Sequence, residues 1–253
     1  MSSSVTRSDV RISCIICAFN EAPRIAAVLE VVSRHPLLHE TIVVDDGSTD
    51  DTAGIVRHFP SVRLISYPVN QGKSYAMATG VAAAQNELLM LLDADLAGLA
   101  AEQVTALAAP VLSGQAAISL SLRQNSLAIF RAIGLDFVSG ERVVRKELLS
   151  AVLEEIRRLP RFGIEVFMNR QIIAQRLSIA VTHWPHVTQF RKTEKLGYWK
   201  GLRAEWRMIS DLFRVAYPLV LILQTCRLLS LRVDHRREPA YAMRVAKPGY
   251  NAR

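Results

Sequence analysis

The chain has 253 residues, of which 50% are hydrophobic, and it contains only 12 Gly and 10 Pro. This composition excludes a disordered or collagen-like protein, and the length allows a sizeable core in one α/β domain, with or without an appendage. The formal net charge of +8 is unevenly placed: from Arg191 onward fourteen Lys or Arg and five Asp or Glu give +9, and the preceding residues carry about −1. A basic tail is typical of proteins that bind nucleic acid or an anionic membrane surface.

The first half of the chain alternates short apolar runs with helical patterns. Residues 1–10 are Ser-rich and are expected to form a flexible N-terminus. Apolar runs without regular polar alternation are typical of parallel strands that are covered on both faces. The predicted strands are 12–17, 41–44, 63–66 and 88–92, and the predicted helices are 23–34, one that follows Asp51, and 74–84. Four such repeats require a parallel sheet with right-handed crossovers.

The second half of the chain predicts further helices and strands of the same body. Helices are predicted at 101–113, 126–134, 143–158 and 164–176, and strands at 117–122, 136–138 and 178–182. From Lys195 to Leu223, apolar residues recur at spacings of three and four, which predicts a long amphipathic helix that Pro218 bends or interrupts. Only twelve uncharged residues separate Arg214 from Arg227, whereas spanning a bilayer takes roughly twenty. This helix can pack on the body, on a second subunit of a homodimer, or at residues 198–232 on an anionic membrane surface.

The three cysteines favour a reducing compartment. No secretory signal precedes Cys14, Cys17 or Cys226, so we expect a cytoplasmic protein that can associate peripherally with the inner face of the cell membrane. Cys14 and Cys17 form a C-x-x-C pattern, but they lie in a predicted strand, where residues three apart point to opposite faces. Core packing is therefore the better interpretation than redox or metal chemistry.

Acidic residues follow three of the predicted strands. These groups are Asn20-Glu21, Asp45-Asp46 and Asp93-Ala94-Asp95. Because ligands of open α/β sheets bind outside the carboxyl ends of the strands, the three groups are expected on one rim, where they repel unless a ligand uses them. A divalent metal that bridges a diphosphate explains Asp93 and Asp95, although an isolated Asp-x-Asp can equally be a helix cap beside a solvated carboxylate.

Two further residues suit a nucleotide at this rim. Asp46 can accept a hydrogen bond from a ring N–H of a base, and Lys73, at a predicted helix start, can neutralise or orient the nucleotide. The alternatives are ordinary structural roles. Asp45 and Asp50 suit helix capping, and Lys73 suits a solvated position in the first turn of its helix.

Four segments in order carry a resemblance to a known family. CAFNEAPRI, IVVDDGSTDDT, NQGKSYAMATG and LLMLLDADL resemble the GT-A fold glycosyltransferases of family two over residues 12–96. The resemblance implies a Rossmann-like α/β fold with a mostly parallel sheet flanked by helices, a nucleotide-sugar donor, and Mg²⁺ or Mn²⁺ held through the Asp-x-Asp. We expect a GT-A domain over residues 11–193, with a nucleotide-binding half at 11–97 and an acceptor half at 98–193. A basic amphipathic helical tail would follow at 194–253.

The second half of the chain narrows the resemblance. FVSGERVVRKELL, RFGIEVFMNRQI and a His-bearing strand end look like the branch of glucosyl-3-phosphoglycerate synthases, and the layout also resembles polyprenyl-phosphate sugar synthases. By this resemblance the nucleotide sugar would contact Ala18, Asn20, Glu21, Asp46, Lys73, Asp93 and Ala94. The metal ligands would be Asp93, Asp95 and His186, with His183 as the fallback. Asp95 and Glu165 would be catalytic, with Glu165 facing the donor sugar or the acceptor.

The acceptor site is the least determined part. Arg123 and Arg142 are candidates to bind an anionic acceptor beside Gly140, because a guanidinium matches phosphate in a bidentate fashion; solvation or pairing with Glu141 is the alternative. Two departures from the family pattern bear on this site. Leu96-Ala97 stands where polyprenyl-phosphate enzymes commonly carry a Leu-Gln that helps to hold the metal, which favours the histidine variant. The Gly-Arg-Val-Thr loop that grips phosphoglycerate is not evident at 119–125.

The expected function is metal-dependent transfer of a sugar from a UDP- or GDP-sugar to a phosphorylated small molecule or a lipid phosphate. One alternative is a catalytically silent scaffold that binds a nucleotide sugar or a membrane. A sugar nucleotidyltransferase is another, but such enzymes carry a Gly-rich loop after the first strand and CAFNEAP has none. Nucleic-acid binding rests on the basic tail alone, and we do not expect it.

Overall fold

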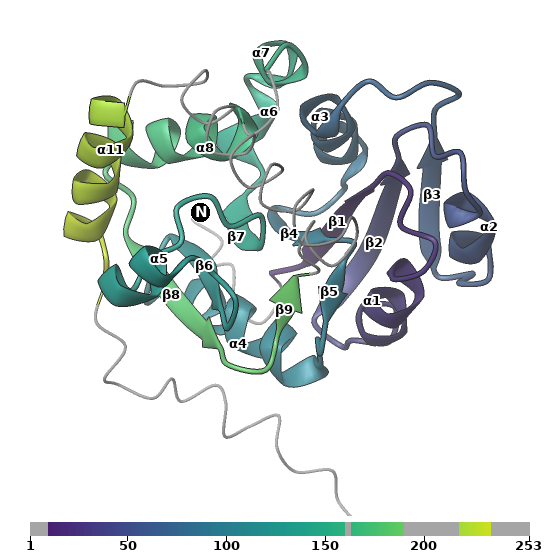
Figure 1. The fold of residues 1–253 in the computed structure, drawn as a ribbon, viewed down its shortest axis with the longest axis horizontal. Helices are drawn as coiled ribbons and strands as arrows, with labels where there is room; N and C mark the ends of the chain where they lie inside the picture. The colour runs from purple at the N-terminus through teal and green to yellow at the C-terminus, as the bar shows by residue number, and fades with distance from the viewer. Residues whose placement is uncertain (1–9, 160–162, 190–217, 234–253) are drawn as a thin grey trace, which may run out of the picture.

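A computed structural model describes residues 10–159, 163–189 and 218–233 of the chain. These residues form a seven-stranded sheet in the order β3-β2-β1-β4-β7-β6-β8, with a separate two-stranded sheet of β5 and β9. Helices cover both faces of the large sheet, with α3 and α8 on one side and α1 and α4 on the other (Figure 1). The protein is therefore a three-layer α/β structure.

The first half of the chain forms four parallel strands of the sheet, as predicted. The strands are β1 (Ile12–Ala18), β2 (Leu38–Asp45), β3 (Val62–Ser66) and β4 (Leu88–Asp93), and the helices between them are α1 (Ile25–Val32), α2 (Thr52–Arg57) and α3 (Lys73–Ala83). In register, Ala18 lies beside Asp45 and Cys17 lies beside Asp93. The carboxyl ends of β1, β2 and β4 therefore meet at one edge.

The second half completes the sheet. Its elements are β5 (Leu96–Ala97), α4 (Ala101–Leu112), β6 (Ile118–Arg123), α5 (Ala128–Ile133), β7 (Arg142–Arg145), α6 (Glu147–Ser150), α7 (Leu153–Arg157), α8 (Gly163–Ala174), β8 (Ile179–Trp184) and β9 (Thr188–Gln189). β7 runs antiparallel between β4 and β6, whereas β6 and β8 are parallel. The sheet is continuous across the boundary between the two predicted halves.

Two predictions in this half were wrong. The helix predicted over 143–158 is a strand at its start, because the β-branched Val143 and Val144 are fully buried between β4 and β6. Only α6 and α7 keep the helical pattern. The strand predicted at 136–138 is absent from the described chain; this stretch forms a turn in which the Asp136 carboxylate accepts a hydrogen bond from the amide of Val138.

The core lies in two clusters, one on each face of the sheet. Cys14 packs in the cluster beneath α1 and α4, and Cys17 packs against the cluster beneath α3 and α8. The pair therefore points to opposite faces, and the structure confirms the core-packing interpretation. Burial raises the pKa of the Cys17 thiol to about 12, so it stays protonated at neutral pH.

The last described helix, α11 (Pro218–Ser230), packs on the body. Two of its own residues, Leu221 and Leu228, are buried against the body. The side-chain amide of Gln224 donates a hydrogen bond to the Val166 carbonyl of α8 at 3.2 Å. The helix begins at Pro218, the residue predicted to interrupt the amphipathic pattern. The rest of the predicted tail, 194–217 and 234–253, and the N-terminal residues 1–9 lie outside the described residues. Within the described ranges, no helix is both long enough and apolar enough to cross a membrane.

Candidate active site

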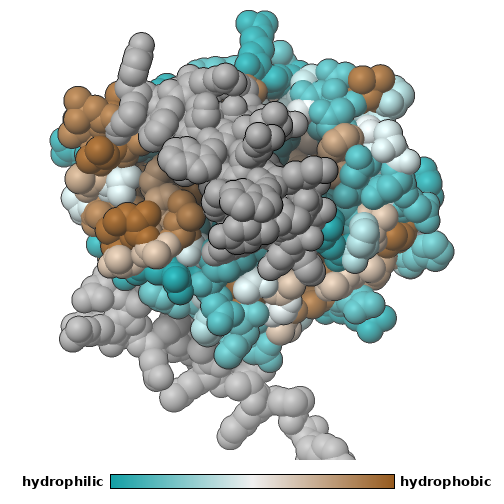
Figure 2. All heavy atoms as spheres, in the orientation of Figure 1, coloured by the Kyte–Doolittle hydropathy of each residue, from teal (hydrophilic) through white to brown (hydrophobic). Residues whose placement is uncertain are grey.

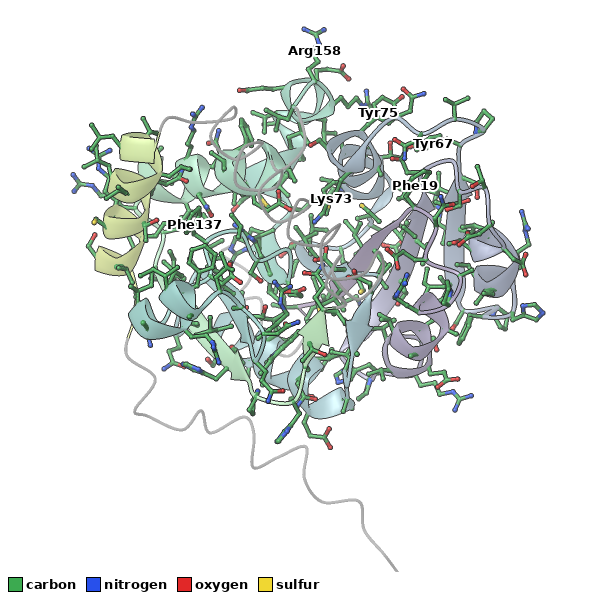
Figure 3. The ribbon with its side chains drawn as sticks, in the orientation of Figure 1. Phe19, Tyr67, Lys73, Tyr75, Phe137 and Arg158 are labelled. Carbon is green, nitrogen blue, oxygen red and sulfur yellow. The ribbon has the colours of Figure 1, made fainter. Side chains whose placement is uncertain are left out.

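Lys73 joins two carboxylates from distant parts of the chain. It is the first residue of α3, and its ammonium lies 3.0 Å from Asp93 Oδ1 and 2.8 Å from Glu165 Oε1. Asp93 ends β4 and Glu165 lies in the first turn of α8. Figure 3 shows Lys73 near the middle of the molecule, between α3 and the sheet. Three residues that the sequence predicted for the site are therefore brought into direct contact.

The charges in this cluster shift one another's protonation. Burial alone would lower the pKa of Lys73, but Asp93 and Glu165 raise it well above its usual value. Burial likewise raises the pKa of Asp93, and the positive charges of Lys73 and Arg123 outweigh that effect, so the net pKa lies below the usual value. Lys73 and Asp93 are therefore a pair of fixed opposite charges at neutral pH. The second oxygen of Glu165, Oε2, is buried and has no hydrogen-bond partner among the described residues.

Arg123, at the end of β6, is a buried internal cation. Its guanidinium pairs with Glu141 and lies 3.6 Å from Asp136 and 3.9 Å from Asp93. Glu141 is fully buried, and its other oxygen accepts hydrogen bonds from the hydroxyls of Ser121 and Ser139. Arg123 therefore supports Asp93 from inside the fold, and this position does not favour the predicted contact with an anionic acceptor.

The structure gives Arg142 and Gly140 roles inside the fold and not the predicted contact with the acceptor. Arg142 is fully buried, and its guanidinium donates to the carbonyls of Ser139 and Phe137 and to the Asn169 side chain. We therefore withdraw Arg142 as an acceptor-binding residue. A Cβ at Gly140 would lie 2.6 Å from Asp93 Oδ1, so the glycine leaves room for that carboxylate.

Gln189 is the site residue that the sequence did not predict. Its Nε2 donates to Asp93 Oδ2 and to Asp95 Oδ1, each at 3.0 Å. It comes from β9, which pairs with β5 directly after Asp95, so that Gln189 lies opposite Leu96. This pairing joins segments more than ninety residues apart and has no local sequence signal.

The predicted histidine ligands are not assembled with the aspartates. His183 and His186 are exposed, and no group of three His, Cys, Asp or Glu in the described ranges is placed to hold a metal. The short β9 strand turns Gln189 toward the aspartates and leaves His186 in the preceding turn. No described contact joins His186 to the aspartates, and its role as third ligand stays a prediction. The oxygens of Asp93 and Asp95 still converge on one position, and carboxylate oxygens suit Mg²⁺ or Mn²⁺.

The predicted nucleoside residues lie at the ends of β1 and β2. Ala18 and Ala94 are buried, and Glu21 pairs with Arg24 at 2.8 Å. The Asp46 carboxylate accepts the backbone amides of Gln71 and Gly72, each at 2.8 Å, and so fixes the loop that precedes Lys73.

Asn20 connects the loop after β1 to the loop after β2. It has a positive φ of 56°, and its side-chain oxygen accepts the Thr49 amide at 2.8 Å. Asn20 does not cap α1, which begins at Ile25. The Asp50 carboxylate accepts a hydrogen bond from the backbone amide of Thr52, the first residue of α2, but the N-cap residue of this helix is Asp51.

A family model matches the part of the chain that contains the strand ends. Residues 13–129 match the model of glycosyl transferase family 2. The matched segment covers less than half of the chain. It contains Lys73, Asp93, Asp95 and Arg123, whereas Glu165 and Gln189 lie beyond the matched residues.

Two relatives are similar to this segment over part of their length. A dolichyl-phosphate beta-glucosyltransferase of Trichomonas vaginalis is 36% identical over 101 residues, which cover 35% of this chain and 30% of the relative. A glucosyl-3-phosphoglycerate synthase of Mycobacterium tuberculosis is 33% identical over 114 residues, 41% of this chain and 35% of the relative. The matched segments therefore span about a third of the length of these relatives.

Solved structures extend the likeness in fold beyond the matched segment. The glucosyl-3-phosphoglycerate synthase of Mycobacterium tuberculosis with phosphoglyceric acid has a TM-score of 0.64 and 24% identity, covering 83% of this chain and 81% of that chain. A complex of the same enzyme with Mn²⁺, UDP-glucose and phosphoglyceric acid has a TM-score of 0.62 at 24% identity and covers 83% and 80% of the two chains. This likeness confirms the predicted GT-A fold.

The ion pairs of Lys73 predict how stability depends on pH. Because the folded-state pKa of Asp93 lies below its unfolded value, its pairing contributes stability above the unfolded pKa and loses it as the pH falls through the folded pKa. Lys73→Met leaves the two carboxylates without this cation and raises the pKa of Asp93. We expect the variant to lose about 1–3 kcal/mol of unfolding free energy near pH 7, and the deficit to shrink toward about pH 3, below the unfolded Asp pKa of about 3.9.

Urea denaturation at both pH values measures this deficit. Arg63→Met is the matched control, because its half-exposed guanidinium lies 3.9 Å from Glu40 and contributes little at either pH. A deficit in Lys73→Met that is equal at the two pH values would show that the lost packing of the side chain, and not its charge, causes the effect.

Proposed function

We propose that the chain is a metal-dependent glycosyltransferase that moves a sugar from a nucleoside diphosphate to an acceptor that carries phosphate. The observation that carries the proposal is the cluster of Lys73, Asp93 and Glu165 beside Asp95, at the edge where the carboxyl ends of the strands meet. Cations and carboxylates in contact at this edge suit a diphosphate and its metal. The family 2 match over residues 13–129 supports the same reaction class.

The nucleotide sugar would bind across the ends of β1, β2 and β4. Asp46 fixes the backbone at Gln71 and Gly72, and this loop leads into α3 and Lys73. We propose a UDP-sugar as donor, with GDP-sugars as the comparison, because the similar synthase structure contains UDP-glucose. The loops at Asn20 and Asp46 would surround the base. The Lys73 ammonium would lie near the diphosphate, since its 36% exposed side chain remains partly open to solvent.

Asp93 and Asp95 would hold Mg²⁺ or Mn²⁺. When bound, the metal would offset the negative charge that builds on the leaving diphosphate as the glycosidic bond breaks. The protein positions these ligands firmly: Lys73 and Arg123 lie on two sides of Asp93, and Gly140 leaves space for its carboxylate. Both positive groups also keep Asp93 ionised, which is the form that binds a cation.

Glu165 is the residue best placed to act on an acceptor. Lys73 holds its Oε1, and the buried Oε2 has no partner within the described residues, so Oε2 can accept the proton of an acceptor hydroxyl. If the nucleophile is a phosphate oxygen, no base is needed and Glu165 would orient the donor sugar. The acceptor class rests on relatives, whose names include dolichyl phosphate and 3-phosphoglycerate.

A lipid-phosphate acceptor fits the outer surface of α11. Figure 2 shows hydrophobic surface over α11 and near α5. Six of the eight large hydrophobic side chains that are exposed in the described chain lie there: Leu127, Ile129, Leu219, Val220, Ile222 and Leu223. Residues 126–134 and 218–233 contain Arg131, Arg227 and Arg232 and no Asp or Glu. An apolar face with only basic charge suits an anionic membrane surface.

A donor assay tests the proposed reaction. The full chain is incubated with UDP- and GDP-sugars and Mn²⁺, and release of the nucleotide is measured with and without a chelator. We expect turnover of at least one donor, and a loss of about 10²–10³-fold in Asp95→Asn, because one group that stabilises the transition-state charge is weakened. Asp51→Asn, an exposed residue at the start of α2, is the control. Turnover that survives both the chelator and Asp95→Asn would contradict the metal assignment, and no turnover of any donor would favour a silent binding protein.

A flotation assay tests the membrane surface. We expect the full chain to float with anionic liposomes and Leu219→Glu/Ile222→Glu to float several-fold less, because both side chains are more than half exposed on α11. Val69→Glu is the control, since Val69 is 62% exposed but lies in the loop before α3. Equal flotation of the double variant and the wild type, or no flotation of the wild type, would remove the membrane from the proposal.

A further inference from the structure

The amide of Gln189 lies at the point where the carboxylates of Asp93 and Asp95 converge. One atom, Nε2, is 3.0 Å from Asp93 Oδ2 and 3.0 Å from Asp95 Oδ1. A group that donates to both carboxylates at once has the position that a cation shared by them would need. The amide nitrogen carries two N–H donors, which is the number required to satisfy the pair.

The backbone of Gln189 is fixed on both sides. β9 pairs with β5 immediately after Asp95, with Leu96 opposite Gln189. The side chain of Asn125 accepts a hydrogen bond from the backbone N–H of Gln189 at 3.2 Å and donates one to the backbone carbonyl of Gln189 at 2.7 Å. Gly98 allows His186 to approach, because a Cβ there would lie 2.4 Å from the His186 carbonyl oxygen. Gln189 is therefore preorganised beside the aspartates by main-chain contacts that do not involve its own side chain.

The side-chain amide can change roles without moving its backbone. A half-turn about the last side-chain bond exchanges Nε2 and Oε1, which brings a neutral oxygen to the position that the nitrogen occupies. In one orientation the amide donates to the two carboxylates. In the other orientation it offers an oxygen ligand to a cation between them. Two carboxylates and an amide make an all-oxygen set, which suits Mg²⁺ and Mn²⁺, whereas an imidazole would favour Zn²⁺ or Ni²⁺.

We propose that Gln189, through Oε1, is the third protein ligand of the metal held by Asp93 and Asp95, and that its oxygen makes the site selective for hard cations. This inference rests on the proposed function, because it takes the aspartate pair as a metal site. It assigns His186 and His183 no place in the first coordination sphere. It also gives Gln189 a second role, in which the amide replaces the cation between the carboxylates when the metal is released.

Direct metal binding tests the proposal without an activity measurement. Binding of Mn²⁺ to the full chain in the presence of UDP is measured by electron paramagnetic resonance, for the wild type, Gln189→Ala, Gln189→His and Gln175→His. Gln175 is exposed at the end of α8 and serves as the control. We expect Gln189→Ala to weaken Mn²⁺ binding about 10–100-fold. We expect Gln189→His to raise the affinity for Zn²⁺ relative to Mg²⁺ by about tenfold or more, and the control to match the wild type.

The same samples report the ligand atom. Electron spin-echo modulation detects an imidazole nitrogen bound to Mn²⁺; we expect it in Gln189→His and not in the wild type or in Gln175→His. Unchanged binding in Gln189→Ala, or imidazole nitrogen modulation in the wild type, would overturn the assignment of Gln189 and leave the proposed function intact. If the wild type bound no Mn²⁺ with UDP, the aspartate pair would not be a metal site, and both proposals would fail. Thermal melting of each variant checks that it is folded.

Discussion

The ammonium of Lys73 lies between the carboxylates of Asp93 and Glu165, and much of the site depends on this contact. The three residues come from α3, β4 and α8, so one cation joins the first half of the chain to the second. Without it, two buried carboxylates would face each other in a medium where like charges repel strongly. The contact fixes the charge state of Asp93 and leaves one oxygen of Glu165 available.

A second cation, Arg123, offsets the negative charges of the buried acidic residues at the same edge of the sheet. Its contacts with Glu141 and Asp136, and its approach to Asp93, distribute charge through a network that the hydroxyls of Ser121 and Ser139 complete. Breaking such a buried network is costly because it leaves uncompensated charge. Asp93 is therefore held by the fold on one side and by Lys73 on the other. These two cations explain how several acidic residues can lie together at one edge of the sheet. The carboxylate oxygens that the cations do not pair with can bind a ligand.

The sequence predicted the parts of the structure that local patterns encode. The continuous apolar runs marked β1 to β4, and the acidic ends of β1, β2 and β4 lie together because parallel strands share one carboxyl edge. The pattern failed at β7, where Val143 and Val144 also suit a helix, and pairing with β4 and β6 decided the strand. Arg142 was assigned the wrong role and Gln189 was not predicted at all, both for the same reason. Burial of an arginine by backbone carbonyls and the pairing of β9 with β5 depend on contacts far apart in the chain.

The location of the metal and the nucleotide tests the central claim most directly. A crystal of the full chain grown with Mn²⁺ and UDP, with diffraction data collected at the manganese absorption edge, locates the metal by its anomalous signal. We predict a manganese peak within about 2.0–2.4 Å of oxygens of Asp93 and Asp95, with the diphosphate next to Lys73. A manganese peak elsewhere, or UDP bound away from the carboxyl ends of β1, β2 and β4, would contradict this location of the active site.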